Sequence, residues 1–255
     1  MNIKLKINMG NMLRSGNPAL KKETFKNLTH TSQGLMTLEG TVNKTVLGLC
    51  ILLASGYYTY VNAIMDYVLI GFIGGLIVAI VTIFKKEWAP ITVPIYAILE
   101  GLALGGVSKM YAMAFEPGIV PKAIFLTLGI LFALLFAYKT KIIKATENFK
   151  LIVFSATAGI GVVYLISFVM SMFGFSEGMA IMSPTNSSLM SIGFSLFVVA
   201  IAALNLVMDF DFIEEGVNSG APKYMEWYGA FGLLVTLIWL YLEILRLLGK
   251  LSSRN

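Results

Sequence analysis

The sequence predicts an all-α membrane protein, a bundle of seven transmembrane helices, and three observations lead to this fold class. The chain of 255 residues is 57% hydrophobic and only 13% charged, with a mean hydropathy of +0.81, which is far more apolar than a soluble domain. Seven apolar runs are long enough for the ~20 helical residues that cross a hydrocarbon core. The runs lack the alternation of β-barrel strands, so helices must satisfy their backbone groups in lipid.

Turn and charge signals separate the predicted spans. KKEWAP follows the second span, FEPGIVP the third, KTKIIKATENFK the fourth and GVNSGAPK the sixth. Within the second and third spans, Gly71 and Gly75, and likewise Gly101 and Gly105, are four residues apart. This spacing predicts close helix packing, either within the chain or at a dimer face. The expected spans are, in order, residues 45–62, 67–84, 91–111, 121–138, 151–173, 189–210 and 228–248.

The charges divide the chain into a tail, a transmembrane domain and a short end. Residues 1–44 are expected to form a polar cytoplasmic tail, 45–250 the seven-helix domain and 251–255 a C-terminal tail. Most lysines lie in the tail and in the loops after even-numbered spans, which places these segments in the cytoplasm and the C-terminus outside. The net charge of +5 then reflects loops facing the lipid bilayer, and no nucleic-acid partner is expected.

Few residues are suited to enzymatic chemistry. The single histidine, His30, lies in the polar tail, and the single cysteine, Cys50, lies in the first span. These positions exclude a zinc site or a histidine-based triad within the bundle, and no nucleotide fingerprint occurs. We therefore expect neither an enzyme nor a resident cofactor.

Three carboxylates lie within the predicted spans, at Glu100, Asp209 and Glu243. An ionisable group in hydrocarbon costs ~2.5 to 3.5 kcal/mol even on lenient insertion scales, so it usually faces the bundle interior or a water-filled path. Glu100 lies near the middle of its span, after Pro94 and before Gly101. It is predicted to lie on an ion route or, alternatively, to be a protonated acid bonded to a neighbouring helix.

Asp209 and Glu243 differ in their neighbours along the helix. Asn205, four residues before Asp209, shares its face, whereas Asp211 points about 200° away and is expected at the wetted end of the helix. Arg246 follows Glu243 by three residues, a spacing that allows an intrahelical ion pair. Such a pair is the structural alternative to a functional role for Glu243.

These features together resemble the transmembrane Bax inhibitor motif family, in particular its bacterial YccA-like branch. The resemblance implies six helices around a central C-terminal helix, in a bacterial inner membrane, and a leak of calcium under pH control. The similar stretches are RSGNPAL (14–20), LEGLALGG (99–106), MDFDFIEEG (208–216), APKYMEWYGAFGLL (221–234) and WLYLEILRLL (239–248).

In that family an acidic pair from helices six and seven is proposed to share a proton. The resemblance assigns the pair to Asp209 and Glu243, although Glu243 stands where the family usually has Asp, and it places Glu100 on the ion route. Two carboxylates in contact cannot both ionise cheaply, so the pair would titrate as a unit and the channel would be closed in acid and leaky when alkaline. The three acids would bind calcium only transiently. Asn205, Asp211 and Arg246 are possible secondary residues of the site.

The separation of Asp209 and Glu243 sets an expectation for register. Two residues at the same depth in a pair of antiparallel helices are equally far in sequence from the turn between the helices. For Asp209 and Glu243 this turn would centre at residue 226, whereas the turn signals centre near residue 219. Either residues 221–231 bend, or the two acids lie at different depths by up to ~20 Å at 1.5 Å per residue.

Two other functions stay open. The chain could be a regulatory protein that binds and modulates a membrane protease or another membrane protein without conducting ions. It could also exchange calcium for protons, although the sequence has no visible inverted repeat of the kind found in many secondary transporters.

Overall fold

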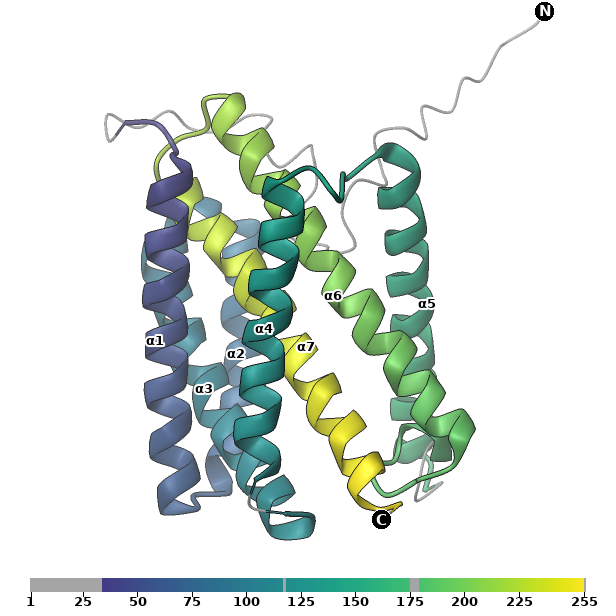
Figure 1. Ribbon diagram of the computed structural model, residues 1–255. Helices are drawn as coiled ribbons and strands as arrows, with labels where there is room; N and C mark the ends of the chain where they lie inside the picture. Colours follow the sequence, from purple (N-terminus) through teal and green to yellow (C-terminus); the bar gives the residue numbers. More distant parts are fainter. Residues whose placement is uncertain (1–33, 117, 175–178, 255) are drawn as a thin grey trace, which may run out of the picture.

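The computed structural model describes residues 34–254 apart from 117 and 175–178, and this part of the chain forms a bundle of seven long α-helices (Figure 1). All seven are long and apolar enough to cross a membrane, which confirms the predicted fold class and makes the chain a multi-pass membrane protein. Most of the expected polar tail lies outside the described residues. The helices are α1 (Leu38–Asn62), α2 (Asp66–Phe84), α3 (Ala89–Ala114), α4 (Ile119–Lys139), α5 (Glu147–Met172), α6 (Leu189–Asn218) and α7 (Met225–Ser252), with short 3-10 turns at Lys86–Trp88 and Ala180–Met182.

The C-terminal helix α7 lies at the centre of the bundle. Helices α1, α3, α4 and α6 all pack along it, while α2 packs mainly on α3 and α5 mainly on α6. Figure 1 shows α5 at the outer edge of the molecule, beyond α6. The expected ring of six helices around α7 is therefore reduced to four that pack along it, because α2 and α5 form an outer layer.

Glycines hold α3 close to the helices on either side, as their spacing predicts. A Cβ atom at Gly71 of α2 would lie 2.4 Å from the carbonyl oxygen of Leu99 on α3. On the opposite side, a Cβ at Gly105 of α3 would lie 2.1 Å from the carbonyl oxygen of Gly56 on α1. Contact of backbone with backbone requires small residues, so the two glycine pairs form two separate seams that fix α3 between α1 and α2.

Helix α1 begins earlier than its apolar run. It starts at Leu38 rather than at residue 45, and the side chain of Thr37 caps it by accepting a hydrogen bond from the amide of Gly40. The hydroxyls of Thr41 and Thr45 donate to carbonyl oxygens one turn earlier, so these polar residues do not interrupt the helix. The predicted domain boundary at residue 44 thus falls inside α1, because hydropathy marks the part in lipid and not the whole helix.

The connection between α6 and α7 is short. Helix α6 continues to Asn218, beyond the expected residue 210, and α7 already begins at Met225. Phe212 and Ile213 are buried against the bundle, and this packing extends α6 through a stretch that is polar on its other face. Gly220 ends the helix in the left-handed conformation, with φ +67°. The register of the two helices is consequently set by residues 219–224.

Candidate functional site

Asp209 lies on α6 at its contact with α7 and is completely buried, with 0% exposure. The hydroxyl of Thr236 on α7 lies beside its carboxyl, but neither carboxyl oxygen receives a hydrogen bond of standard geometry from a described residue. Burial of a polar group without a partner is costly. Asp209 is thus the acid whose environment is least explained by packing alone.

Asp209 belongs to a row of buried oxygens on one side of α6, which we call the α6 oxygen row and define as Ser195, Asn205 and Asp209. Asn205 donates from Nδ2 to the Oγ1 of Thr157 on α5 (2.9 Å) and to the carbonyl oxygen of Ile201 (2.9 Å), which leaves its Oδ1 without a partner. Helix geometry places the three residues within about 80° of each other.

The α6 oxygen row is unusual in the molecule as a whole. Among the described residues, the buried side-chain polar atoms that lack a hydrogen-bond partner are Ser195 Oγ, Asn205 Oδ1 and both carboxyl oxygens of Asp209, and all belong to this row. Native proteins contain few such atoms, and those that occur are commonly satisfied by water or ions or have a functional role. The row therefore contains the described buried polar atoms whose hydrogen bonding is left incomplete by the protein itself.

Glu243 has the opposite environment. Its carboxyl, 1% exposed, accepts hydrogen bonds from the hydroxyl of Tyr164 on α5 (2.5 Å) and from Nη1 of Arg246 (2.8 Å to each oxygen). The guanidinium of Arg246 also lies over the ring of Tyr164, 5.4 Å from its centroid. The intrahelical ion pair that the spacing allowed is thus formed, and Tyr164 extends it to α5.

Asp209 and Glu243 do not meet in this structure. Thr236 is the α7 residue beside Asp209, and Glu243 lies seven residues further along α7, about 10 Å at 1.5 Å per residue. The expectation of a carboxyl pair in contact is therefore not met in this state, because the short connection at 219–224 sets a register that brings residue 236 rather than residue 243 to Asp209. Of the two arrangements expected for residues 221–231, the structure has the one without a bend in 225–231, which is helical, and the two acids accordingly lie at different depths.

Glu100 lies away from both of these acids, on the seam between α2 and α3. It is 7% exposed, and its carboxyl faces Gly75 of α2 so closely that a Cβ there would lie 2.3 Å from Oε1. No described group of three or more acidic, histidine or cysteine side chains is arranged to hold a metal ion. The three predicted acids therefore occupy three separate places rather than one common calcium site.

Asp211 faces away from Asp209, as helix geometry predicts. Its carboxylate pairs with Lys150 at the start of α5 (2.5 Å) and is partly exposed. One turn further along α6, Glu214 accepts a hydrogen bond from the hydroxyl of Tyr138 on α4 (2.6 Å). The acids at this end of α6 thus connect it to α4 and α5 and are not part of the α6 oxygen row.

Sequence reasoning overlooked a buried ion pair at the start of α7. Glu226 is 0% exposed and accepts hydrogen bonds from the amide (3.0 Å) and hydroxyl (2.8 Å) of Thr37, and its other oxygen pairs with Lys44. Glu226 lies two residues before the predicted seventh span, which begins at residue 228. The group ties the first turn of α7 to the first turns of α1.

Lys250 was also overlooked. Its Nζ, at the far end of α7, donates to the carbonyl oxygens of Ile181 (2.6 Å) and Ser191 (3.1 Å) and is buried. Thr236, Glu243 and Lys250 are spaced by seven residues and therefore lie on one stripe of α7. This repeat of a polar residue at every seventh position is the sequence signal that would have identified the interior face of the helix.

Comparison with known proteins identifies one family. The model of the family described as Bax inhibitor 1 like matches residues 17–253, almost the entire chain. No curated protein is significantly similar to the chain in sequence.

Proposed function

Because the chain belongs to the Bax inhibitor 1 like family, we propose that it is a pH-sensitive calcium leak channel of a bacterial inner membrane. The observation that carries this proposal is the α6 oxygen row, with its completely buried and unpartnered acid. The distribution of lysines supports a cytoplasmic N-terminus and an external C-terminus.

The chemistry of the α6 oxygen row suits a hard cation. Calcium is bound by carboxylate, amide and hydroxyl oxygens, and Asp209, Asn205 and Ser195 supply one group of each kind. Ser195 and Asp209 are 14 residues apart on one helix, or ~21 Å at 1.5 Å per residue, which is most of a hydrocarbon core of ~30 Å. In this proposal a cation passes along the side of α6 that carries the row and does not rest in a closed site.

Asp209 is the proposed proton sensor. The charged groups on neighbouring elements are engaged elsewhere, since Lys150 pairs with Asp211 and Arg246 with Glu243. The neutral acid has little attraction for a cation, whereas a carboxylate at this place requires one, because a lone buried charge is costly. We therefore expect a low leak in acid and a higher leak when alkaline.

Glu243 is proposed to hold α7 in place through Tyr164 and Arg246. A proton shared between Glu243 and Asp209 would require a second state in which α7 has moved about 10 Å along α6. A sensor made of Asp209 alone requires no such movement, and we prefer it for that reason. Glu100 is kept as a proposed second acid of the ion route, on the α2 side of α3.

Calcium entry into dye-loaded liposomes, measured from pH 6 to pH 8 with and without a proton gradient, tests this proposal. We expect the flux of the native protein to rise with pH without any need for a proton gradient, and Asp209→Asn to flatten the dependence. Asp211→Asn is the matched control, because it changes an acid two residues away that faces Lys150. Glu100→Gln tests the second acid of the route in the same assay.

The possible results separate the remaining alternatives. Flattening by Glu243→Gln to the same degree as by Asp209→Asn would favour the shared proton. A flux that disappears without the proton gradient would favour exchange of calcium for protons. Native liposomes that behave like empty ones would reject the channel and leave the regulatory protein that binds a membrane protease or other membrane partner.

A further inference from the structure

A deep apolar groove opens on the side of the bundle between α1 and α4. It has a volume of about 440 Å³, within the range of small-ligand pockets. Leu49, Leu53 and Tyr57 of α1 form one wall, Ile124 and Leu128 of α4 form the other, and residues of α3 and α7 form the floor. In the described part of the chain α1 packs along α3 and α7 and α4 along α7 and α6, with at most slight contact between α1 and α4.

The mouth of the groove faces the membrane. Leu53 and Tyr57 are 45% and 70% exposed, and both lie on α1, which crosses the bilayer. Their exposed surface is therefore in contact with lipid, and a lipid chain can enter from the side without passing through water. The groove is not connected by any shared residue to the α6 oxygen row.

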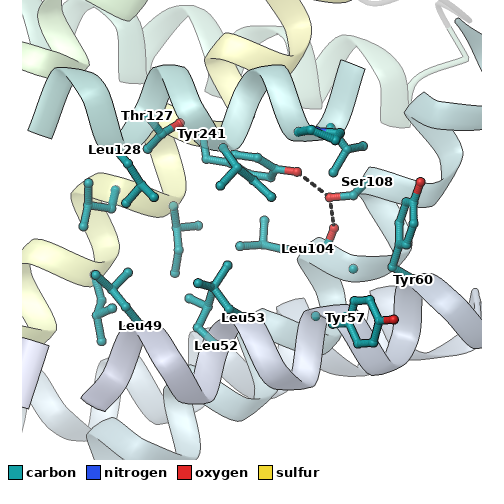
Figure 2. A pocket seen from close by; sticks show the side chains of 18 residues that line it. Leu49, Leu52, Leu53, Tyr57, Tyr60, Leu104, Ser108, Thr127, Leu128 and Tyr241 are labelled. Atoms are coloured by element: carbon teal, nitrogen blue, oxygen red, sulfur yellow. Dashed lines mark hydrogen bonds between the residues drawn. The ribbon is translucent and has the colours of Figure 1, made fainter. Parts of the chain in front are cut away.

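The interior of the groove is suited to hydrocarbon. Figure 2 shows the hydroxyl of Tyr241 directed at Ser108, with which it shares a hydrogen bond of 2.6 Å, while Ser108 also bonds the carbonyl oxygen of Leu104. The hydroxyl of Thr127 donates to the carbonyl oxygen of Ala123 (2.8 Å). Each of these hydroxyls thus has a hydrogen-bond partner within the protein, so it requires none from an occupant.

One end of the groove is different. Tyr57 and Tyr60 lie in the last two turns of α1, and their hydroxyls make no hydrogen bond with a described residue. The Nζ of Lys109 on α3 lies over the ring of Tyr60, 5.2 Å from its centroid. Lysine and tyrosine at the ends of transmembrane helices lie at the level of the lipid headgroups, so this end offers a positive charge and two hydroxyls to an anionic group.

The length of the groove matches one leaflet. Its lining on α1 extends from Leu49 to Tyr60, about 16 Å at 1.5 Å per residue. This is close to half of a hydrocarbon core of ~30 Å. The leucine end lies toward the middle of the membrane and the tyrosine end at its surface, which is the orientation of a lipid molecule in that leaflet.

We propose that this groove binds one acyl chain of an anionic phospholipid from the leaflet in which α1 ends, with the headgroup phosphate at Lys109, Tyr57 and Tyr60. The bound chain lies against Leu234 and Ile238 of the central helix. It fills the gap that α1 and α4 leave beside α7. This site is independent of ion conduction.

Photocrosslinking of the full-length protein in liposomes tests the site. The probes are phosphatidylglycerol and phosphatidylcholine, each with a diazirine on its acyl chain, and crosslinked residues are identified by mass spectrometry. We expect phosphatidylglycerol to label the α1 and α4 walls above the level found on the exposed face of α2. Ile124→Trp and Leu53→Trp, which fill the groove from opposite walls, should each abolish this excess. Ile77→Trp, on the exposed face of α2, should not.

The headgroup is tested by one further pair of variants. Lys109→Gln should lower the preference for phosphatidylglycerol over phosphatidylcholine about fivefold, the usual effect of one basic residue near an anionic surface. Lys122→Gln is the control, because Lys122 already pairs with Glu116. Equal labelling of the groove and the α2 face would overturn the site. Excess labelling without a headgroup preference, or a preference that Lys109→Gln leaves unchanged, would overturn the proposal that the bound lipid is anionic.

Discussion

Asp209 and Glu243 are both almost completely buried in a membrane protein, and their surroundings differ in every other respect. The carboxyl of Glu243 has a guanidinium and a phenol as hydrogen-bond partners, whereas that of Asp209 has only the hydroxyl of Thr236 beside it. Burial alone therefore does not identify a functional acid. A functional acid is distinguished from a structural one by whether an opposite charge and hydrogen bonds compensate its carboxyl group, since a buried charge needs both.

The largest expected effect is on the partnered acid. Glu243→Gln leaves the buried guanidinium of Arg246 without its counter-charge and should lower the free energy of unfolding by about 2 to 3 kcal/mol, the value of hydrogen bonds to charged groups. Unfolding in detergent, followed by tryptophan fluorescence, measures the loss. The double variant Glu243→Gln with Arg246→Gln should recover part of it, and a double variant as unstable as the sum of the two single changes would contradict the pairing.

A smaller effect is expected from two serines on α6. Ser191 and Ser195 are both buried, but the hydroxyl of Ser191 donates to the carbonyl oxygen of Ile181 (2.9 Å) and that of Ser195 has no partner. Ser191→Ala should cost about 1 kcal/mol, whereas Ser195→Ala should be neutral or stabilising. Unfolding in detergent measures both variants. Equal losses in the free energy of unfolding would mean that Ser195 has a hydrogen-bond partner.

The smallest effect on stability is expected at Asp209 itself. Asp209→Asn removes no ion pair and keeps the shape of the side chain, so the free energy of unfolding at neutral pH should change by less than about 1 kcal/mol. A loss as large as that for Glu243→Gln would show that a cation compensates Asp209, and the contrast between the two acids would fail. If the Asp209→Asn protein is stable but its calcium flux no longer depends on pH, Asp209 is a functional acid and Glu243 a structural one.

The sequence predicts the helices well because lipid imposes a strict length and composition on each span. Gly71 and Gly105 lie at close helix contacts as predicted, because such contacts admit only small residues. The opposite directions of Asp209 and Asp211 follow from the geometry of a single helix. The pairing of Glu243 with Arg246 likewise depends only on positions within α7.

The relation between helices is harder to predict than the helices themselves. Hydropathy ends the sixth span at residue 210, but packing of Phe212 and Ile213 continues α6 to Asn218. This extension, with a connection of only residues 219–224, brings Thr236 to Asp209 in place of Glu243. Glu226 and Lys250 were overlooked because a charged residue near the end of an apolar run is usually exposed, and their partners lie far away in sequence.

The contact of Glu226 with Thr37 joins residues 189 positions apart, so it forms only after α1 to α6 and the first turn of α7 have been synthesised. Until then the faces of α1, α3, α4 and α6 that pack on α7 have no partner. Synthesis that stops before α7 is therefore expected to yield an incomplete bundle with exposed packing surfaces, and incompletely folded proteins are substrates of cellular proteases. The packing of the bundle thereby becomes conditional on the synthesis of α7.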